Sequence, residues 1–251
     1  MWLQAEYLPA SLFTLKLSLA TSSGARSLLV PTPFAIKTAL VDALLRTNAG
    51  GSPEALTRAL AGSTVALRPS ARATITNLFA RVLKPRREDG GSSGGDRGAE
   101  SEGETESESG SATGPYGKTI AYREYVHLDG ALGVAIETGD PALAESLSWL
   151  LAQVNYFGRR GSFFQLSARP TLAADLPAGF IPIGVPQQRF AADGLIQMLD
   201  DWGPEMTFDK LDIYSSGRIR LGRERVLHSA VLPYRRVRSS RSFTEYELIP
   251  A

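Results

Sequence analysis

The chain contains no cysteine and only two histidines, His127 and His228, among its 251 residues. The lack of cysteine excludes thiol nucleophiles, disulfides and thiolate metal sites. Two histidines are too few for a histidine-rich metal centre, although carboxylates remain available as metal ligands. Because a chain without thiols fits a reducing compartment, we expect a cytoplasmic protein, and we expect no cofactor.

No long hydrophobic run is present, although 43% of the residues are hydrophobic. Residues 1–21 lack a basic start and Lys16 interrupts their apolar pattern, so we expect neither a signal peptide nor a membrane anchor. A chain of this length and hydrophobic content predicts one large domain, or one domain with an appendage.

The net charge of +1 hides two segments of opposite sign. Eight acidic residues and one arginine give residues 88–113 a net charge of −7, so the rest of the chain carries +8. A second segment, 210–241, carries +7. A basic body of this kind favours a polyanionic partner, and we expect that partner to be nucleic acid.

Residues 90–114 are almost wholly Gly, Ser, Glu, Asp, Ala and Thr. They contain no aromatic or large aliphatic residue to offset the entropy lost on ordering, which predicts a disordered acidic insertion over about 86–117. We interpret the tract as a tolerated surface extension; the alternatives are a polyanion mimic and a loop that orders on a partner.

Hydrophobic periodicity and capping residues predict an alternation of strands and helices. Before the insertion we expect a strand within 2–20, helices over 33–46 and 53–60, and a strand in the second half of 75–84. After it we expect strands over 118–127 and 131–138 joined by an Asp129-Gly130 hairpin, a helix from Asp140-Pro141, and a strand over 162–167. This order predicts an α+β fold with a ferredoxin-like (RRM-like) domain over 1–169.

Residues 170–251 are expected to form a basic, β-hairpin-rich C-terminal region. We expect a short helix within 191–202 and strands at 211–214, 218–221, 226–232 and 243–249. Arginines fall on and between these strands, which is typical either of a basic surface for RNA, duplex DNA or protein, or of a solvated sheet face. The secondary RNA-binding candidates here are Arg235, Arg236, Arg238 and Arg241.

The segment 155–164, NYFGRRGSFF, is the most informative for function. Arginine forks bind phosphates and aromatic rings stack on bases, so Arg159 and Arg160 are expected to contact RNA, with Tyr156 and Phe157 as stacking residues. The alternative is a helix C-cap at Gly158 followed by a solvated turn.

Two motifs resemble the Cas-five family of CRISPR effector subunits, within the RAMP superfamily of repeat-associated RNA-binding proteins. They are LVPTPFAIK at 29–37, entering the first helix, and YFGRR at 156–160, leaving the second. The resemblance covers roughly 1–169 by element order. The family commonly has a small residue, often glycine, where this chain has Thr38.

The resemblance implies a non-catalytic RNA-binding subunit of a type I CRISPR ribonucleoprotein, the Cascade complex of antiviral defence. Such subunits hold the 5′ handle of the guide crRNA, cap the Cas-seven-type backbone and touch the Cas-eight-type large subunit, with target DNA contacted indirectly. The further handle contacts expected here are Lys37, Arg123 and Tyr122.

In this family a projection between the second and third strands acts as a thumb that lies against the RNA. The corresponding residues of this chain are 84–116. The resemblance therefore implies RNA contacts by the basic base of the projection, Lys84, Arg86 and Arg87, whereas its acidic tip would repel phosphates.

Some members of the family cleave precursor guide RNA without metal, using a tyrosine, a histidine and a lysine. His127, Tyr122 and Lys118 supply these residue types, which makes a metal-independent endoribonuclease the first alternative function. On an ideal strand, however, His127 shares a face with Tyr125 and not with Tyr122, which favours a surface histidine.

A protein-binding ferredoxin-like module is the second alternative, and the concentration of arginines argues against it. Asp200 and Asp201 beside Trp202 are the best carboxylate pair for a metal, but adjacent acids at a helix end are usually solvated, so we expect no metal.

Overall fold

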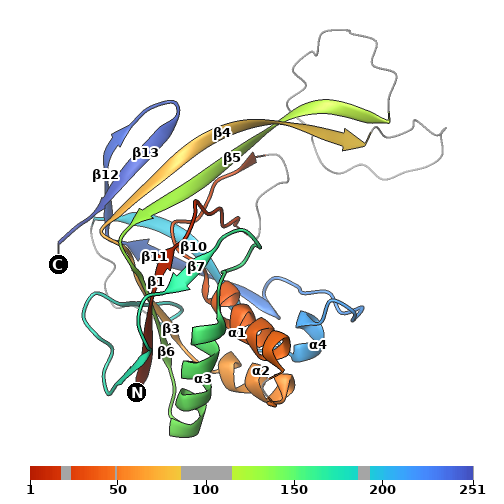
Figure 1. Ribbon diagram of the computed structural model, residues 1–251, viewed down its shortest axis with the longest axis vertical. Coiled ribbons are helices and arrows are strands. Elements are labelled where there is room, and N and C mark those ends of the chain that lie inside the picture. The colour runs from red at the N-terminus through yellow and green to blue at the C-terminus, as the bar shows by residue number, and fades with distance from the viewer. Residues whose placement is uncertain (18–23, 49, 86–114, 186–192, 251) are drawn as a thin grey trace.

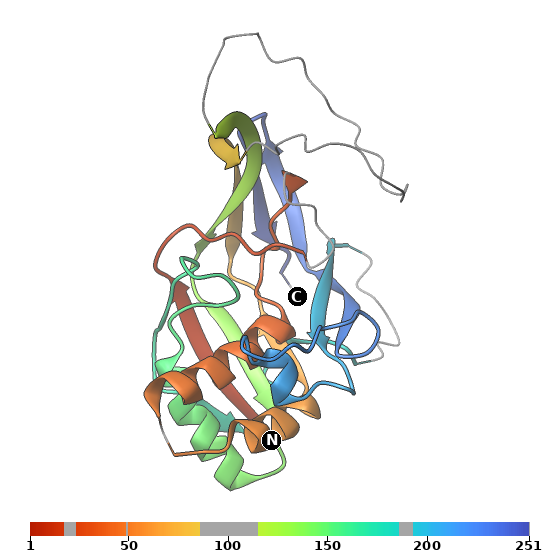
Figure 2. The same ribbon diagram turned by 90° about the vertical axis from the view of Figure 1, so that its right-hand side faces the viewer.

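The computed structural model describes residues 1–17, 24–48, 50–85, 115–185 and 193–250 (Figure 1). The fold is α+β, as the sequence predicts. Helices pack against a sheet in the body, and a long two-stranded arm projects from it (Figures 1 and 2). Most of the predicted acidic insertion, 86–114, lies outside the described residues. Within the part of the chain that is described, no helix is long and apolar enough to cross a membrane.

The body is built on an antiparallel sheet whose four main strands run in the order β7-β1-β6-β3. These strands are β1 (Trp2–Pro9), β3 (Val65–Arg68), β6 (Leu132–Glu137) and β7 (Phe164–Leu166). The short strands β8 (Thr171–Ala173) and β9 (Ile181–Pro182) pair with β1 and β3. Helices follow the first and third main strands, which is the ferredoxin-like arrangement, so this part of the fold prediction is confirmed.

Three helices of the body begin at the predicted capping residues. They are α1 (Pro33–Thr47), α2 (Pro53–Ala61) and α3 (Pro141–Gln153). Thr32 Oγ1 accepts a hydrogen bond from Ala35 N at 3.1 Å, and Ser52 and Asp140 cap the other two helices in the same way. In each helix proline follows the cap, where its missing N–H costs nothing.

The arm consists of β4 (Arg72–Pro85) and β5 (Tyr116–Asp129), which pair antiparallel over their whole length (Figure 1). Because β4 follows β3 and β5 leads into β6, the arm continues the β3–β6 pair beyond a bend. The predicted Asp129-Gly130 hairpin is therefore wrong, since β5 and β6 lie in different sheets. Gly130, at φ +103°, supplies the left-handed backbone of the bend instead of a two-residue turn.

The strand predictions before the arm need two further corrections. The second strand of the body sheet is β3, and the segment predicted at 75–84 belongs to the arm. The first strand is β1, whereas residues 13–16 make only isolated bridges, from Phe13 to Val126 and from Lys16 to Ser27. The chain leaves the body sheet after Pro9 and crosses toward β5, which breaks the alternating segment into separate contacts.

The C-terminal region contributes to three sheets, since β8 and β9 join the body sheet. Strands β12 (Tyr234–Ser239) and β13 (Phe243–Leu248) extend the arm sheet in the order β12-β13-β4-β5-β2, where β2 is Gly24–Ala25. Strand β10 (Leu195–Trp202) pairs with β11 (Arg225–Leu232). The helix predicted within 191–202 is therefore wrong, because pairing with β11 supplies a strand ladder that local sequence does not reveal.

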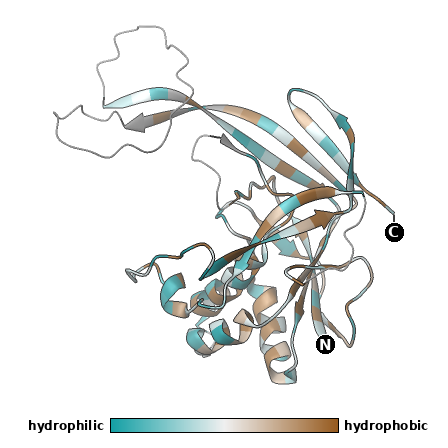
Figure 3. Ribbon diagram, turned by 180° about the vertical axis from the view of Figure 1, so that it is seen from behind, coloured by the Kyte–Doolittle hydropathy of each residue, from teal (hydrophilic) through white to brown (hydrophobic). Residues whose placement is uncertain are grey.

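Strands predicted at 211–214 and 218–221 are also absent from the described residues. Instead, the short helix α4 (Phe208–Leu211) leads into a loop that returns to β11. Apolar residues follow the strands at the centre of the molecule, whereas hydrophilic residues are frequent on the helix surfaces and loops (Figure 3). One continuous core joins the body sheet, α1, α3 and the β10–β11 pair.

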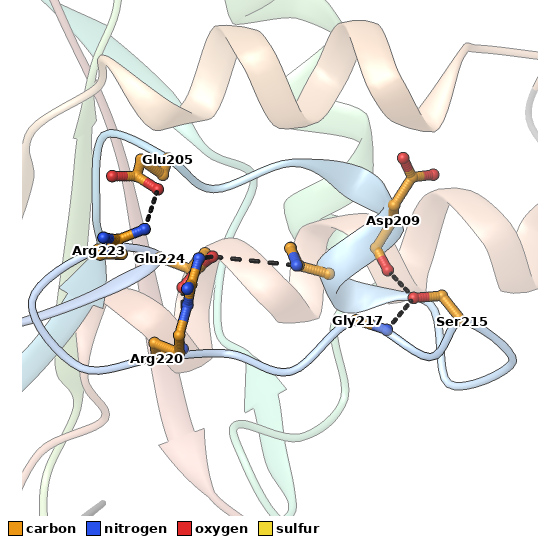
Figure 4. Close-up of polar contacts among 8 residues, drawn as sticks. Glu205, Asp209, Ser215, Gly217, Arg220, Arg223 and Glu224 are labelled. Carbon is orange, nitrogen blue, oxygen red and sulfur yellow. Dashed lines mark hydrogen bonds and ion pairs between the residues drawn. The ribbon is translucent and has the colours of Figure 1, made fainter.

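The loop between β10 and β11 is organised around the buried carboxylate of Glu224 (Figure 4). Arg220 donates to this carboxylate from its backbone N at 2.9 Å and from its guanidinium at 3.2 Å. Lys210 Nζ lies 3.9 Å away, and Arg223 makes an exposed ion pair with Glu205 at 3.8 Å. Polar contacts of side chains therefore hold this segment where a strand was predicted.

Acidification is expected to weaken this loop. Hydrogen bonds from Arg220 lower the pKa of Glu224 from 4.5 to about 2. A carboxyl whose pKa is lower in the folded state stabilises the fold fully above its unfolded value, and this stabilisation is lost as the pH falls toward about 2. Thermal unfolding across that window should show a smaller loss of stability for Glu224→Gln than for the wild type. Parallel profiles would contradict the assignment, and Glu205→Gln, which alters an exposed pair, is the control.

Candidate nucleic-acid interface

Four cationic side chains from distant parts of the chain line one pocket of about 500 Å³. They are Lys16, Arg123 on β5, Arg159 and Arg225 at the start of β11. We call this the basic pocket; its lining also includes Phe34, Ala35 and Thr38 of α1. Convergence of cations in a concave site suits a phosphate-bearing ligand.

The segment 155–164 places its two arginines on the surface through a tight turn. Gly158 has φ +69°, and a Cβ there would lie 3.1 Å from Leu15 Cδ2, so glycine fits both the backbone and the space. Ser162 N donates to Arg159 O at 3.0 Å and closes the turn. Arg159 and Arg160 are both exposed, and Arg159 reaches the basic pocket.

Gly158 is not the C-cap of the preceding helix. Helix α3 ends at Gln153, and its C-cap is Val154 in an extended conformation. The left-handed glycine belongs to the next turn, which displays the arginines, so the alternative interpretation of this segment as a helix cap is wrong.

The aromatic residues of the same segment divide between core and surface. Phe157 is completely buried and packs edge-on against Tyr7 and Phe164, with ring centroids 5.0 and 5.1 Å away. Its prediction as a base-stacking residue is therefore wrong, because the ring has no exposed face. Tyr156 is half-buried and remains a stacking candidate, while the exposed Phe163 opposite it in a β-bridge is a candidate that sequence reasoning missed.

Lys37, which was predicted to contact RNA, is buried and not on the surface. Its side chain is 1% exposed, and its Nζ lies 2.8 Å from Asp201 Oδ1. Asp201 Oδ1 also accepts a hydrogen bond from Trp202 N at 2.6 Å. The expectation that Asp200 and Asp201 are solvated is wrong too, because both are buried on β10, where Asp200 lies against Arg225.

Tyr122 on β5 lies in a polar cluster. Its hydroxyl is 2.9 Å from Glu124 Oε1 and 3.0 Å from Asn77 Oδ1, and its ring is 5.3 Å from that of Phe79. Burial and the Glu124 carboxylate raise the pKa of Tyr122 to about 12, so the phenol stays protonated at neutral pH. Glu124 also accepts a hydrogen bond from Ser27 N at 2.7 Å, which connects the arm to the segment that precedes α1.

The three residues of the proposed nuclease do not converge. Side chains alternate along β5, so Tyr122 and Lys118 share one face while His127 lies exposed on the other. The hydroxyl of Tyr122 is also engaged by Glu124. His228 on β11 is half-buried. Its ring lies against Gly184, where an added Cβ would be 2.9 Å from the ring. Across the described ranges, no cluster of three or more His, Cys, Asp or Glu residues is arranged to hold a metal.

The predicted contacts at the base of the projection are mostly outside the described residues. Arg86 and Arg87 lie there, and so does the side chain of Lys84, whose backbone pairs with Gly117 near the end of the arm. These three contacts stay predictions.

The C-terminal arginines are exposed along the edge strand β12 and its turn. Arg235 and Arg238 pair across the sheet with Glu247 at 3.2 Å and Glu245 at 2.8 Å, and Arg236 lies opposite Tyr246. Exposed pairs of this kind contribute little stability and exchange easily with another anion. Arg235, Arg236, Arg238 and Arg241 therefore remain predicted RNA, DNA or protein contacts.

Three charged residues of the basic pocket were not predicted to contact ligand, namely Lys16, Asp200 and Arg225. In the sequence, the only local feature that distinguishes Lys16 is that it interrupts an apolar alternation. Arg225 was one of many C-terminal arginines, and nothing local separates it from the others. Their shared location depends on the pairing of β10 with β11 and on the packing of this pair against α1.

Comparisons with known proteins show only remote likenesses. No protein-family model matches the chain, and no curated protein matches it. One similar solved structure is a chain of a CRISPR RNA-guided surveillance complex, at 15% identity and a TM-score of 0.45, covering 91% of this chain and 88% of that one. Another is a CRISPR protein from Archaeoglobus fulgidus, at 10% identity and a TM-score of 0.36, covering 99% of this chain and 92% of that one.

Proposed function

We propose that this chain is a CRISPR-associated RNA-binding subunit that holds single-stranded guide RNA by its phosphates. The observation that carries the proposal is the convergence of Lys16, Arg123, Arg159 and Arg225 on one pocket. Guanidinium groups form bidentate hydrogen bonds with phosphates, and a concave site strengthens their combined field.

The surroundings of the pocket fit a single strand better than a small anion. Arg160 is exposed beside Arg159, and Phe163 is 47% exposed in the same turn. Adjacent cations and an aromatic face are the combination that binds a backbone and stacks an unpaired base. A duplex offers no such free base, so a single-stranded segment is the proposed ligand.

The finer proposal is that the ligand is the 5′ handle of crRNA in a type I effector complex. It is supported by the LVPTPFAIK and YFGRR motifs, which lie at the pocket: the first leads into α1 and the second holds Arg159. The arm occupies the position of the family's thumb, between the second and third strands of the body sheet.

One face of the arm supports a role in assembly with backbone and large subunits. Cross-strand register places Phe79, Leu83, Ile120 and Tyr116 on the same side, and each is more than half exposed. Exposed apolar residues grouped on a projecting ribbon are typical of an interaction surface. The charged residues Arg81 and Lys118 lie among them, on the same face.

The proposed subunit binds RNA without cleaving it. The proposal is supported by the positions of His127 and Tyr122 on opposite faces of β5, because the alternative nuclease requires an acid and a base side by side. Incubation of the purified chain with repeat RNA in chelator tests this point, because intact bound RNA supports the scaffold and cleavage lost in His127→Ala supports the nuclease.

Affinity for single-stranded RNA is expected to fall steeply with salt. With about six phosphate contacts, the logarithm of the association constant plotted against the logarithm of the salt concentration should have a slope of about −4. Titration of labelled repeat RNA at several salt concentrations measures this slope. A salt-insensitive affinity, or no binding at all, would overturn the proposed function.

A further inference from the structure

The basic pocket contains polar atoms that the protein itself leaves without hydrogen bonds. Among the described residues, three buried side-chain polar atoms have no hydrogen-bond partner, and two of them, Thr38 Oγ1 and Arg225 Nε, belong to residues that line this pocket. Arg225 Nε is 3.1 Å from Asp200 Oδ2, close enough for an ion pair, but its N–H is not directed at the carboxylate. Buried polar groups nearly always have partners, so we expect these two side chains to turn toward a ligand with polar edges that enters the pocket.

The pocket also holds one acidic group. Asp200 is 7% exposed and is the one carboxylate among the lining residues. A carboxylate repels phosphate but accepts hydrogen bonds from N–H donors. The pocket is therefore divided chemically: Lys16, Arg123 and Arg159 suit phosphate, whereas Asp200 suits a neutral group that presents donors.

Arg225 provides a flat surface within the same site. Its guanidinium carbon lies over the Phe34 ring, 4.0 Å from the ring centre, and its side chain is 28% exposed. Unpaired bases stack on arginine planes as well as on aromatic rings. A planar ligand fits the group of Arg225, Asp200 and Thr38 better than a sugar or a phosphate does.

We propose that the basic pocket takes one unpaired nucleobase of the bound RNA and prefers guanine. The inference rests on the proposed RNA-binding function. Guanine presents two neighbouring donors, N1–H and the N2 amino group, which match the two oxygens of the Asp200 carboxylate. Adenine and cytosine present one amino donor beside an acceptor that the carboxylate would repel, and uracil presents a single N–H between two carbonyls.

The remaining polar atoms complete the recognition. Thr38 Oγ1 both donates and accepts, so it bonds to the acceptor edge of the base, and Arg225 donates to the same edge or stacks on the ring. The phosphate beside the base lies against Arg159 and Arg123. Asp200 and Thr38 thus act as specificity residues, while the other cations act on any sequence.

The test compares short uridine-rich RNAs that carry a single guanine, inosine, adenine or cytosine at one position. Wild-type protein is expected to bind the guanine RNA at least about tenfold more tightly than the adenine RNA, since a bidentate contact discriminates by about this factor. Inosine lacks the N2 amino group and should bind with intermediate affinity. Asp200→Asn should abolish the preference, because an amide offers one acceptor and one donor.

Ratios within each variant separate specificity from folding. Arg159→Ala with Arg160→Ala should weaken all four RNAs by a similar factor and keep the guanine preference. Tight binding of all four RNAs by the wild type without preference would overturn the base pocket and leave the proposed function standing. Failure of the wild type to bind any of them would overturn both, and an unchanged guanine preference in Asp200→Asn would remove Asp200 from the site.

Discussion

Replacement of Asp201 by alanine is expected to destabilise the fold by about 3–5 kcal/mol, because it leaves the Lys37 ammonium buried without its partner. For a chain of this size the thermal midpoint should fall by about 10 °C. Lys37 lies on the face of α1 that packs against β10, and its side chain is 1% exposed, so water cannot replace the lost carboxylate. Chemical denaturation monitored by tryptophan fluorescence measures the change in the free energy of unfolding.

A double variant distinguishes the buried pair from an ordinary packing defect. Lys37→Met with Asp201→Leu removes both charges, and it should recover most of the stability lost in Asp201→Ala. Asp42→Ala, which breaks an exposed pair with Arg46 within α1, is the matched control and should cost less than about 0.5 kcal/mol. Equal losses in Asp201→Ala and the double variant would contradict the role assigned to the pair.

The same double variant also tests whether Lys37 contacts RNA. Because Lys37 is enclosed between α1 and β10, its replacement together with Asp201 should leave RNA affinity nearly unchanged. Loss of affinity in a variant that folds normally would return Lys37 to the interface.

Replacement of Arg159 and Arg160 together by alanine is expected to weaken RNA binding by at least about 100-fold at low salt, since each charged contact contributes about 1.5–3 kcal/mol. Two lost phosphate contacts should also make the log–log salt slope shallower by about 1.4. Both side chains are exposed, so stability should change little. Fluorescence anisotropy with repeat RNA at several salt concentrations measures affinity and slope together.

The control lowers the net charge by the same amount elsewhere on the surface. Arg58 on α2 and Arg169 after β7 are exposed and lie outside the lining of the basic pocket. Arg58→Ala with Arg169→Ala should reduce affinity by a small factor through the overall field alone. Equal losses of RNA affinity in the two double variants would mean that net charge, and not the turn at 158–161, governs binding.

Helix beginnings were predictable because their causes are local. A cap needs only a hydroxyl or carboxylate within three residues of the N–H that it satisfies, and Thr32, Ser52 and Asp140 meet that condition. The exposed arginine turn was predictable for the same reason, since glycine on both sides of Arg159 and Arg160 favours a tight turn.

Burial of individual residues was not predictable from their neighbours in the chain. Phe157 and Phe163 have similar surroundings in sequence, but the first packs against Tyr7 and the second is exposed. Phe157 is buried because Tyr7 of β1, which is distant in the sequence, and Phe164 of β7 pack against its ring. Strand β10 was mistaken for a helix because its partner β11 follows a long loop.

The amino-acid sequence by itself determined the α+β class, the ferredoxin-like order, the segregation of charge and the exposed arginine turn. These depend on capping, alternation and composition, which act over a few residues. Tertiary structure decided which charges meet: it buried Lys37 against Asp201, and it brought Lys16, Arg123, Arg159 and Arg225 to one pocket with Asp200. The physical reason is that a charge is buried or exposed according to the group that faces it, and here the facing groups come from distant parts of the chain.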